Sequence, residues 1–128
     1  MPKKILVTED SATILAMIKD VLESKGYEVI TASDGQEALD KAKKENPDLI
    51  ILDLMLPKLD GYKVCRFLKF DEKYKNIPIV MLTARAEEKD IKIGKEVGAD
   101  LYIPKPFDPE FILAKIAELL VVKDAKIL

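Results

Sequence analysis

The most informative absence in this 128-residue sequence is histidine, which does not occur at all. Catalysis by an imidazole and metal binding by histidine are therefore excluded within this chain. Cysteine is almost absent too, since Cys65 stands alone and cannot form an internal disulfide. Because Cys65 lies on an apolar helical face with Val64 and Leu68, we expect a buried structural thiol rather than a reactive one.

Long apolar runs and a strong net charge are also lacking. The longest apolar run is far shorter than the roughly 20 residues that span a bilayer. Only residues 5–7 are apolar after the first lysines, which is not the pattern of a signal peptide. The formal net charge is −2, without a basic stripe, so direct nucleic-acid binding is not expected. These absences predict a cytoplasmic protein that contacts neither membrane nor nucleic acid.

The sequence does contain a regular alternation of short apolar runs and stretches of helical periodicity. Its length favours one domain with its own core, which we place at residues 1–121, followed by a short C-terminal tail at residues 122–128. Each apolar run is expected to be a strand followed by a helix. The expected strands lie at residues 5–7, 28–31, 49–52, 79–82 and 100–103, and the fourth of the five helices lies at residues 87–97.

This alternation predicts an α/β fold with a parallel sheet and right-handed crossovers. The second and fifth runs carry polar residues and fit the sheet edges, whereas the other three are nearly pure apolar and fit the centre. We therefore expect a flavodoxin-like, doubly wound, five-stranded parallel sheet of order 2-1-3-4-5 with five helices. Asp34 should cap the second helix with Glu37 as its capping-box partner, and Gly26 should end the first helix.

A group of polar side chains is expected at one edge of this sheet. Residues 49–52 run directly into Asp53, whose charge would be costly inside the core. That cost is avoided if the strand ends there, at the carboxyl edge where α/β sheets bind ligands. The ends of the other strands deliver Glu9, Asp10, Thr83 and Lys105 to the same edge.

The chemistry of this group indicates a phosphoryl site. Three carboxylates that close together repel one another unless something neutralises them, and Mg²⁺ needs only a few carboxylates and keeps its waters. Lys105 adds a positive charge and Thr83 a hydroxyl, while a carboxylate can act as the nucleophile. Taken singly, each of these residues has an ordinary explanation as a cap, a turn residue or a solvated side chain. Their occurrence together at the carboxyl ends of the predicted strands favours a phosphoryl site.

Several short motifs then occur in a fixed order along the chain. Each alone is weak, but their order and spacing together are highly specific. With them the chain resembles a response-regulator receiver domain over about residues 3–120. The motifs are Glu9-Asp10, Asp53 followed by Pro57 and Asp60-Gly61, Thr83-Ala84, Gly98-Ala99-Asp100 and Lys105-Pro106-Phe107.

The resemblance implies a phosphoacceptor switch of two-component signalling. Asp53 would accept a phosphoryl group from the histidine of a partner kinase or of a histidine phosphotransfer protein, which fits a chain that has no histidine. Mg²⁺, or Mn²⁺ in its place, would be bound by Asp10, Asp53 and the backbone carbonyl of Met55. Glu9 would assist through a water, and Lys105 would contact the phosphoryl group.

The resemblance also implies how the signal leaves the site. Thr83 would move toward the phosphoryl group and Tyr102 would turn inward with it. These movements would bias the surface made by the fourth helix, fifth strand and fifth helix toward an active conformation. Edge-strand packing is the second explanation of Tyr102. The Lys105–Pro106 bond is expected to be cis. Leu101 stands where receivers joined to winged-helix domains tend to have an aspartate used in dimerisation, which puts that dimer in doubt.

Other positions also differ from the family pattern or bear on it. Glu9 replaces the commoner aspartate, a variation that should still hold a cation. Thr8 stands where an apolar residue is usual, and the sequence offers no functional reason for it. Met55 and Arg85 occupy the positions two residues after Asp53 and Thr83, which in the family influence how water reaches the acyl phosphate. Because Met55 is apolar and brings no carboxylate or amide, we expect slow self-dephosphorylation.

Two other functions are weighed against this one. A receiver-like scaffold that only binds partners would not need the carboxylates and the lysine of the predicted site, yet this chain retains all of them. A flavodoxin-like enzyme or nucleotide binder needs a Gly- or Ser/Thr-rich phosphate loop after the first strand, where this chain has Glu9-Asp10. We therefore expect a switch without a separate substrate, whose output is an unknown downstream protein. The sequence leaves open whether the chain is a single-domain regulator or part of a longer protein.

Overall fold

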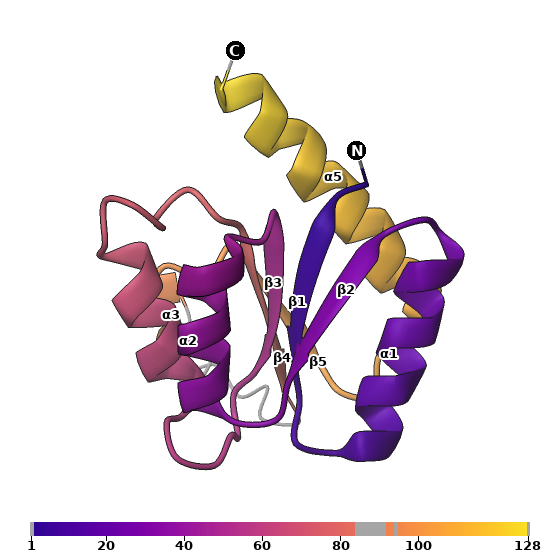
Figure 1. The fold of residues 1–128 in the computed structure, drawn as a ribbon, viewed down its shortest axis with the longest axis horizontal. Helices are drawn as coiled ribbons and strands as arrows, with labels where there is room; N and C mark the ends of the chain where they lie inside the picture. Colours follow the sequence, from indigo (N-terminus) through magenta and orange to yellow (C-terminus); the bar gives the residue numbers. More distant parts are fainter. Residues whose placement is uncertain (1, 84–91, 94, 128) are drawn as a thin grey trace.

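The computed structural model describes residues 2–83, 92, 93 and 95–127 (Figure 1). The described part alternates strands and helices, as the periodicity predicts. In chain order the elements are β1 (Lys4–Thr8), α1 (Ala12–Ser24), β2 (Glu28–Ala32), α2 (Gly35–Glu45), β3 (Leu49–Asp53), α3 (Gly61–Lys69), β4 (Ile79–Thr83), β5 (Leu101–Pro104) and α5 (Pro109–Ile127).

The five strands form one parallel sheet of order β2-β1-β3-β4-β5, which confirms the predicted order. The register places Thr8 opposite Leu52 and Asp53 opposite Leu82, so the strands end at nearly the same level. All residues of β3 and β4 are buried, whereas most of β2 and β5 is partly exposed. This exposure explains the polar residues in the sequences of β2 and β5, because the side chains of an edge strand remain in contact with water.

Helices cover both faces of the sheet, and each face has its own apolar core (Figure 1). On one face α2 and α3 pack over the strands, through side chains such as Leu39 and Leu68. On the other face α1 and α5 do so, through side chains such as Leu22 and Ile116. This two-sided cover is why the central strands read as unbroken apolar runs.

Polar side chains fix the helix starts. Ser11 caps α1 by accepting a hydrogen bond from the backbone N–H of Ile14, at 3.4 Å. Asp34 caps α2 as predicted, accepting from the backbone N–H of Glu37 at 2.8 Å. The reciprocal contact differs from the predicted capping box, because Glu37 accepts from the backbone N–H of Ser33, at 2.7 Å, one residue before the cap. Gly26 follows α1 with φ +87°, as expected of a left-handed helix end.

Two predictions for the C-terminal third have different outcomes. Of the fourth helix expected at residues 87–97, the structure describes only residues 92, 93 and 95–97, of which 92, 93, 95 and 96 are helical; the remainder lies outside the described residues. The segment at 122–128, expected as a tail after the last helix, continues α5 through Ile127. Val121 and Val122 are apolar, and neither is a glycine or a proline, so nothing at these positions ends the helix.

The expectation for Cys65 is confirmed. Its side chain is fully buried, and burial raises the pKa of the thiol to about 12. At neutral pH the residue is therefore a protonated core thiol. Within the described residues, no helix combines the length and the hydrophobicity that a membrane span requires.

Thr8 is an anomaly at the end of β1. Only 1% of it is exposed, and among the described residues its hydroxyl is a buried side-chain oxygen without a hydrogen-bond partner. A buried hydroxyl that lacks a partner costs free energy, since the bond it makes with water in the unfolded chain is not replaced.

Replacing this hydroxyl by a methyl group is expected to stabilise the protein. We predict that Thr8→Val raises the free energy of unfolding by about 1 kcal/mol, measured by urea denaturation. Thr31→Val is the control, because Thr31 lies in the neighbouring strand but is partly exposed, and it should change stability by less than about 0.5 kcal/mol. A loss of stability in Thr8→Val would mean that the hydroxyl is in fact satisfied.

Candidate active site

The polar residues predicted at the sheet edge do gather there. Glu9 and Asp10 directly follow β1, Asp53 is the last residue of β3, Thr83 is the last of β4, and Lys105 follows β5. Parallel pairing of the four strands brings these ends together, although the residues are up to 96 positions apart in the chain. The topology therefore builds the site from separate short segments.

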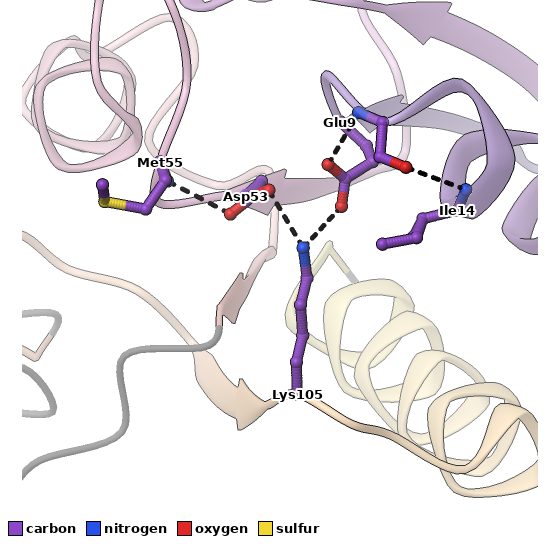
Figure 2. A network of polar contacts seen from close by, with 6 residues as sticks. Glu9, Ile14, Asp53, Met55 and Lys105 are labelled. Carbon is purple, nitrogen blue, oxygen red and sulfur yellow. Dashed lines mark hydrogen bonds and ion pairs between the residues drawn. The ribbon is translucent and has the colours of Figure 1, made fainter.

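The centre of the site is the ammonium group of Lys105, which lies between two carboxylates (Figure 2). Lys105 Nζ donates to Glu9 Oε1 at 2.6 Å and to Asp53 Oδ2 at 3.0 Å. The side chains of Glu9, Asp53 and Lys105 are 3%, 7% and 18% exposed, so all three charges are largely removed from water. Their pairing offsets a desolvation cost that none of them could bear alone.

The remaining carboxylate oxygens are held by the backbone. Glu9 Oε2 accepts from the N–H of Ser11 at 3.1 Å, and Asp53 Oδ1 accepts from the N–H of Met55 at 3.1 Å. Each acid is thus fixed at both oxygens. Ser11 was not among the residues predicted for this site. A small polar residue just before a periodic apolar stretch is the usual mark of a helix cap and could have identified it.

The pKa of Lys105 reflects these contacts. Burial alone would lower the pKa, but the hydrogen bonds and charges of Glu9 and Asp53 outweigh burial and raise the pKa above its ordinary value of 10.5. The folded protein therefore binds this proton more tightly than the unfolded chain does. The resulting stabilisation is fully present below pH 10 and is lost only as the pH rises through the raised pKa.

Glu9, Asp10 and Asp53 form a carboxylate cluster that fits a hard divalent cation. One carboxylate oxygen from each lies within 4.8 Å of those of the other two. Two ligands of Mg²⁺ lie about 2.9–4.2 Å apart, given bonds of 2.0–2.1 Å and octahedral geometry, so a small adjustment brings these oxygens into range. Asp10 is exposed whereas the other two are buried, so the cluster is open to solvent on the Asp10 side.

The loop after β3 approaches the strand closely because of Gly61. A Cβ on Gly61 would lie 2.4 Å from the backbone oxygen of Asp53 and 2.8 Å from Leu54 Cα. The N–H of Gly61 donates to the oxygen of Leu54 at 2.9 Å, and Asp60 caps α3 through the N–H of Lys63 at 3.0 Å. The first turn of α3 is thereby anchored against the strand end that carries Asp53.

The two predicted switch residues lie at different places. Thr83 is fully buried at the site edge, and its backbone oxygen accepts from the N–H of Lys105 at 2.6 Å. Tyr102 lies further back along β5, opposite Met81, and packs partly buried against the core on the α2 and α3 face. The Lys105–Pro106 bond is cis, as expected. Arg85 lies outside the described residues.

Comparison with known proteins gives the same family along the whole fold. The profile of the response regulator receiver domain matches residues 5–117. The chain is 52% identical over 120 residues to the alkaline phosphatase synthesis transcriptional regulatory protein PhoP of Bacillus subtilis, covering 94% of this chain and 49% of PhoP. It is 39% identical over 138 residues to the DNA-binding response regulator MtrA of Mycolicibacterium paratuberculosis, covering 99% of this chain and 60% of MtrA. The chain thus spans about half the length of the first of these relatives.

Solved structures of similar length share the fold. A CheY-like response regulator receiver domain protein from Methanospirillum hungatei superposes with a TM-score of 0.93 at 31% identity, over 98% of this chain and 99% of that one. The chemotaxis protein CheY4 of Vibrio cholerae superposes with a TM-score of 0.87 at 38% identity, over 93% and 99% of the two chains. The chain therefore belongs to the response-regulator receiver family.

Proposed function

We propose that this receiver domain accepts a phosphoryl group on Asp53 from a histidine of a partner kinase or histidine phosphotransfer protein. The observation that carries the proposal is the position of the Asp53 carboxylate. It ends a buried central strand, contacts Lys105 at 3.0 Å and lies within 4.8 Å of two further carboxylates. An aspartate with only a structural role would not require a lysine and two further carboxylates beside it.

The transfer is a displacement at phosphorus. An Asp53 oxygen forms the new P–O bond as the P–N bond to the donor histidine breaks, and the donor imidazole leaves with the electron pair of that bond. Met55 N–H holds one Asp53 oxygen, which orients the carboxylate. Lys105 already contacts Asp53, so its ammonium is in place to neutralise charge that develops on the phosphoryl oxygens.

A divalent cation completes the charge balance in this proposal. Asp10, Asp53 and the backbone carbonyl of Met55 would hold Mg²⁺, or Mn²⁺, and Glu9 would act through a water. The cation supplies positive charge for the oxygens of the incoming phosphoryl group. Glu9, Asp10, Asp53 and Lys105 together carry a formal charge of −2, from three carboxylates and one ammonium, which matches one divalent cation.

The output is proposed to run through Thr83 and Tyr102. Thr83 is buried at the site edge, so a phosphoryl group on Asp53 gives its hydroxyl a new partner. Tyr102 is half-buried and can repack when that edge shifts. The surface of β5 and α5, together with the predicted fourth helix, most of which lies outside the described residues, would then be presented to a downstream protein in the cytoplasm. PhoP and MtrA are named as transcriptional and DNA-binding regulators; for this chain we propose no direct contact with nucleic acid.

Intact-mass measurement after addition of a small phosphodonor with Mg²⁺ tests the proposal. Wild type is expected to gain one phosphoryl group, and none when the cation is chelated. Asp53→Asn is expected to gain none, while the matched control Asp40→Asn, an exposed position on α2, should behave as wild type. No gain in wild type would favour a scaffold that only binds partners, and an equal gain in Asp53→Asn would place the acceptor elsewhere.

The lifetime of the phosphorylated form can be followed in the same samples. Met55 is 57% exposed beside Asp53 and offers neither a carboxylate nor an amide to position a water. We therefore propose that the acyl phosphate is lost slowly. Rapid loss that stops when Met55 is changed would contradict this part of the proposal.

A further inference from the structure

The outer face of α3 carries two exposed aromatic side chains. Phe67 is 57% exposed and Phe70, which directly follows the helix, is 73% exposed. They lie three positions apart, on the side of α3 opposite the buried Val64, Cys65 and Leu68. Scattered exposed apolar residues are common on soluble proteins, but two neighbouring phenylalanines form a contiguous patch of the kind found at interfaces.

Charged residues border this pair in an ordered way. Two cations precede the phenylalanines in the chain and two anions follow them, and the six residues line one shallow hollow. We call it the α3 patch, and its residues are Lys63, Arg66, Phe67, Phe70, Asp71 and Glu72.

The contacts within the patch leave these groups near the surface. The Arg66 guanidinium lies over the Phe70 ring, 5.9 Å from its centroid. Glu72 contacts Lys75 at 2.8 Å, and one Asp71 oxygen accepts from the backbone N–H of Lys73 at 2.9 Å. Arg66 and Glu72 are exposed and Asp71 is partly so. The patch therefore has a positive end, an aromatic centre over which the Arg66 guanidinium lies, and a negative end where Lys75 already pairs with Glu72.

We propose that the α3 patch binds the α3 patch of a second copy of this chain, with the two helices antiparallel. A two-fold axis places the positive end of each copy against the negative end of the other, which makes the patch complementary to itself. The pairing of Arg66 with Asp71 and the pairing of Phe67 with Phe70 have the same midpoint in the chain. An antiparallel arrangement therefore brings both pairs to the same level along the helix axis.

The patch lies away from the phosphoryl site. Helix α3 begins next to Asp53 and runs back along the sheet away from the site (Figure 1). Lys63 lies in its first turn, whereas the other five patch residues lie in its second half or directly after it. Association through the α3 patch does not involve Glu9, Asp53 or Lys105. Six residues a side are far fewer than the roughly 20–30 of a stable interface, so we expect a weak and reversible dimer. The dimer does not depend on the proposed phosphoryl transfer.

Sedimentation equilibrium of the full chain up to about 1 mM tests this proposal. Wild type is expected to associate to a dimer, and Phe70→Ser is expected to weaken the association constant by about tenfold or more. Phe111→Ser is the matched control, because Phe111 is 45% exposed on α5, outside the patch, and its loss should change the constant by less than about twofold. A monomeric wild type, or equal weakening by both variants, would overturn the proposal.

Charge reversal tests the antiparallel arrangement separately. Arg66→Asp and Asp71→Arg should each weaken the dimer by about threefold or more, because like charges then face each other across the axis. The double variant should recover most of the wild-type constant. Failure to recover, in variants whose thermal unfolding shows them to be folded, would refute the proposed pairing.

Discussion

Lys105→Met is expected to lower the free energy of unfolding by about 3 kcal/mol in the presence of EDTA, measured by urea denaturation. The ammonium is the charge partner of two carboxylates that are 3% and 7% exposed. Removing one partner of a buried ion pair costs about 3–5 kcal/mol, since the other charge stays buried and uncompensated. We take the lower end of this range because the side chain of Lys105 is 18% exposed.

Saturating Mg²⁺ should close most of this gap in stability. A cation held by Asp10 and Asp53, with Glu9 acting through a water, replaces the lost positive charge. The variant, which lacks the ammonium, should bind the cation more tightly than wild type and so gain more stability by mass action. We expect the difference between wild type and Lys105→Met to shrink to about 1 kcal/mol. This rescue separates loss of charge from loss of packing, because a cation cannot replace the missing contacts of the lysine stem.

Lys123→Met is the matched control for this experiment. Lys123 is 17% exposed and contacts Asp48 Oδ1 at 3.5 Å, but that carboxylate is 31% exposed and retains water. We expect a loss of about 1 kcal/mol or less, unaffected by Mg²⁺. A similar loss in both variants would mean that the site lysine acts as an ordinary surface ion pair.

Gly61→Ala is expected to have the second-largest effect, a loss of about 2–3 kcal/mol in unfolding free energy. The added Cβ would meet the backbone of Asp53 at 2.4 Å and that of Leu54 at 2.8 Å, and a strand backbone cannot yield as a flexible side chain does. Overpacking of this kind typically costs about 1–3 kcal/mol. The first turn of α3 must move away from β3, so we also expect phosphorylation to slow by about tenfold or more.

Gly26→Ala distinguishes this clash from a general effect of losing a glycine. Gly26 has φ +87° but nothing within 4 Å of its missing Cβ. The substitution should cost about 1 kcal/mol through backbone strain and leave phosphorylation unchanged. If Gly61→Ala lost stability but phosphorylated at the wild-type rate, the close approach would matter for folding and not for the site.

The sequence alone determined the architecture and the members of the site. Apolar runs of strand length placed three strands in the centre and two at the edges, because burial on two faces leaves no room for alternation. The flavodoxin-like order 2-1-3-4-5 satisfies this placement and is the order observed. The carboxyl ends of parallel strands share one edge, so strand assignment alone placed Glu9, Asp53 and Lys105 near one another. The end of α5 was predicted less well, because no proline or glycine marks a stop and periodicity locates ends poorly.

Only the tertiary structure decided which of these groups touch. Nothing in the sequence says that Lys105 lies between Glu9 and Asp53, since a lysine stem has several rotatable bonds and takes the position that neutralises most buried charge. The orphaned hydroxyl of Thr8 and the close approach at Gly61 depend on packing between segments far apart in the chain. Periodicity shows which face a side chain occupies. Distances between side chains of different elements depend on how the sheet and helices pack, and that packing sets the charge balance of the site.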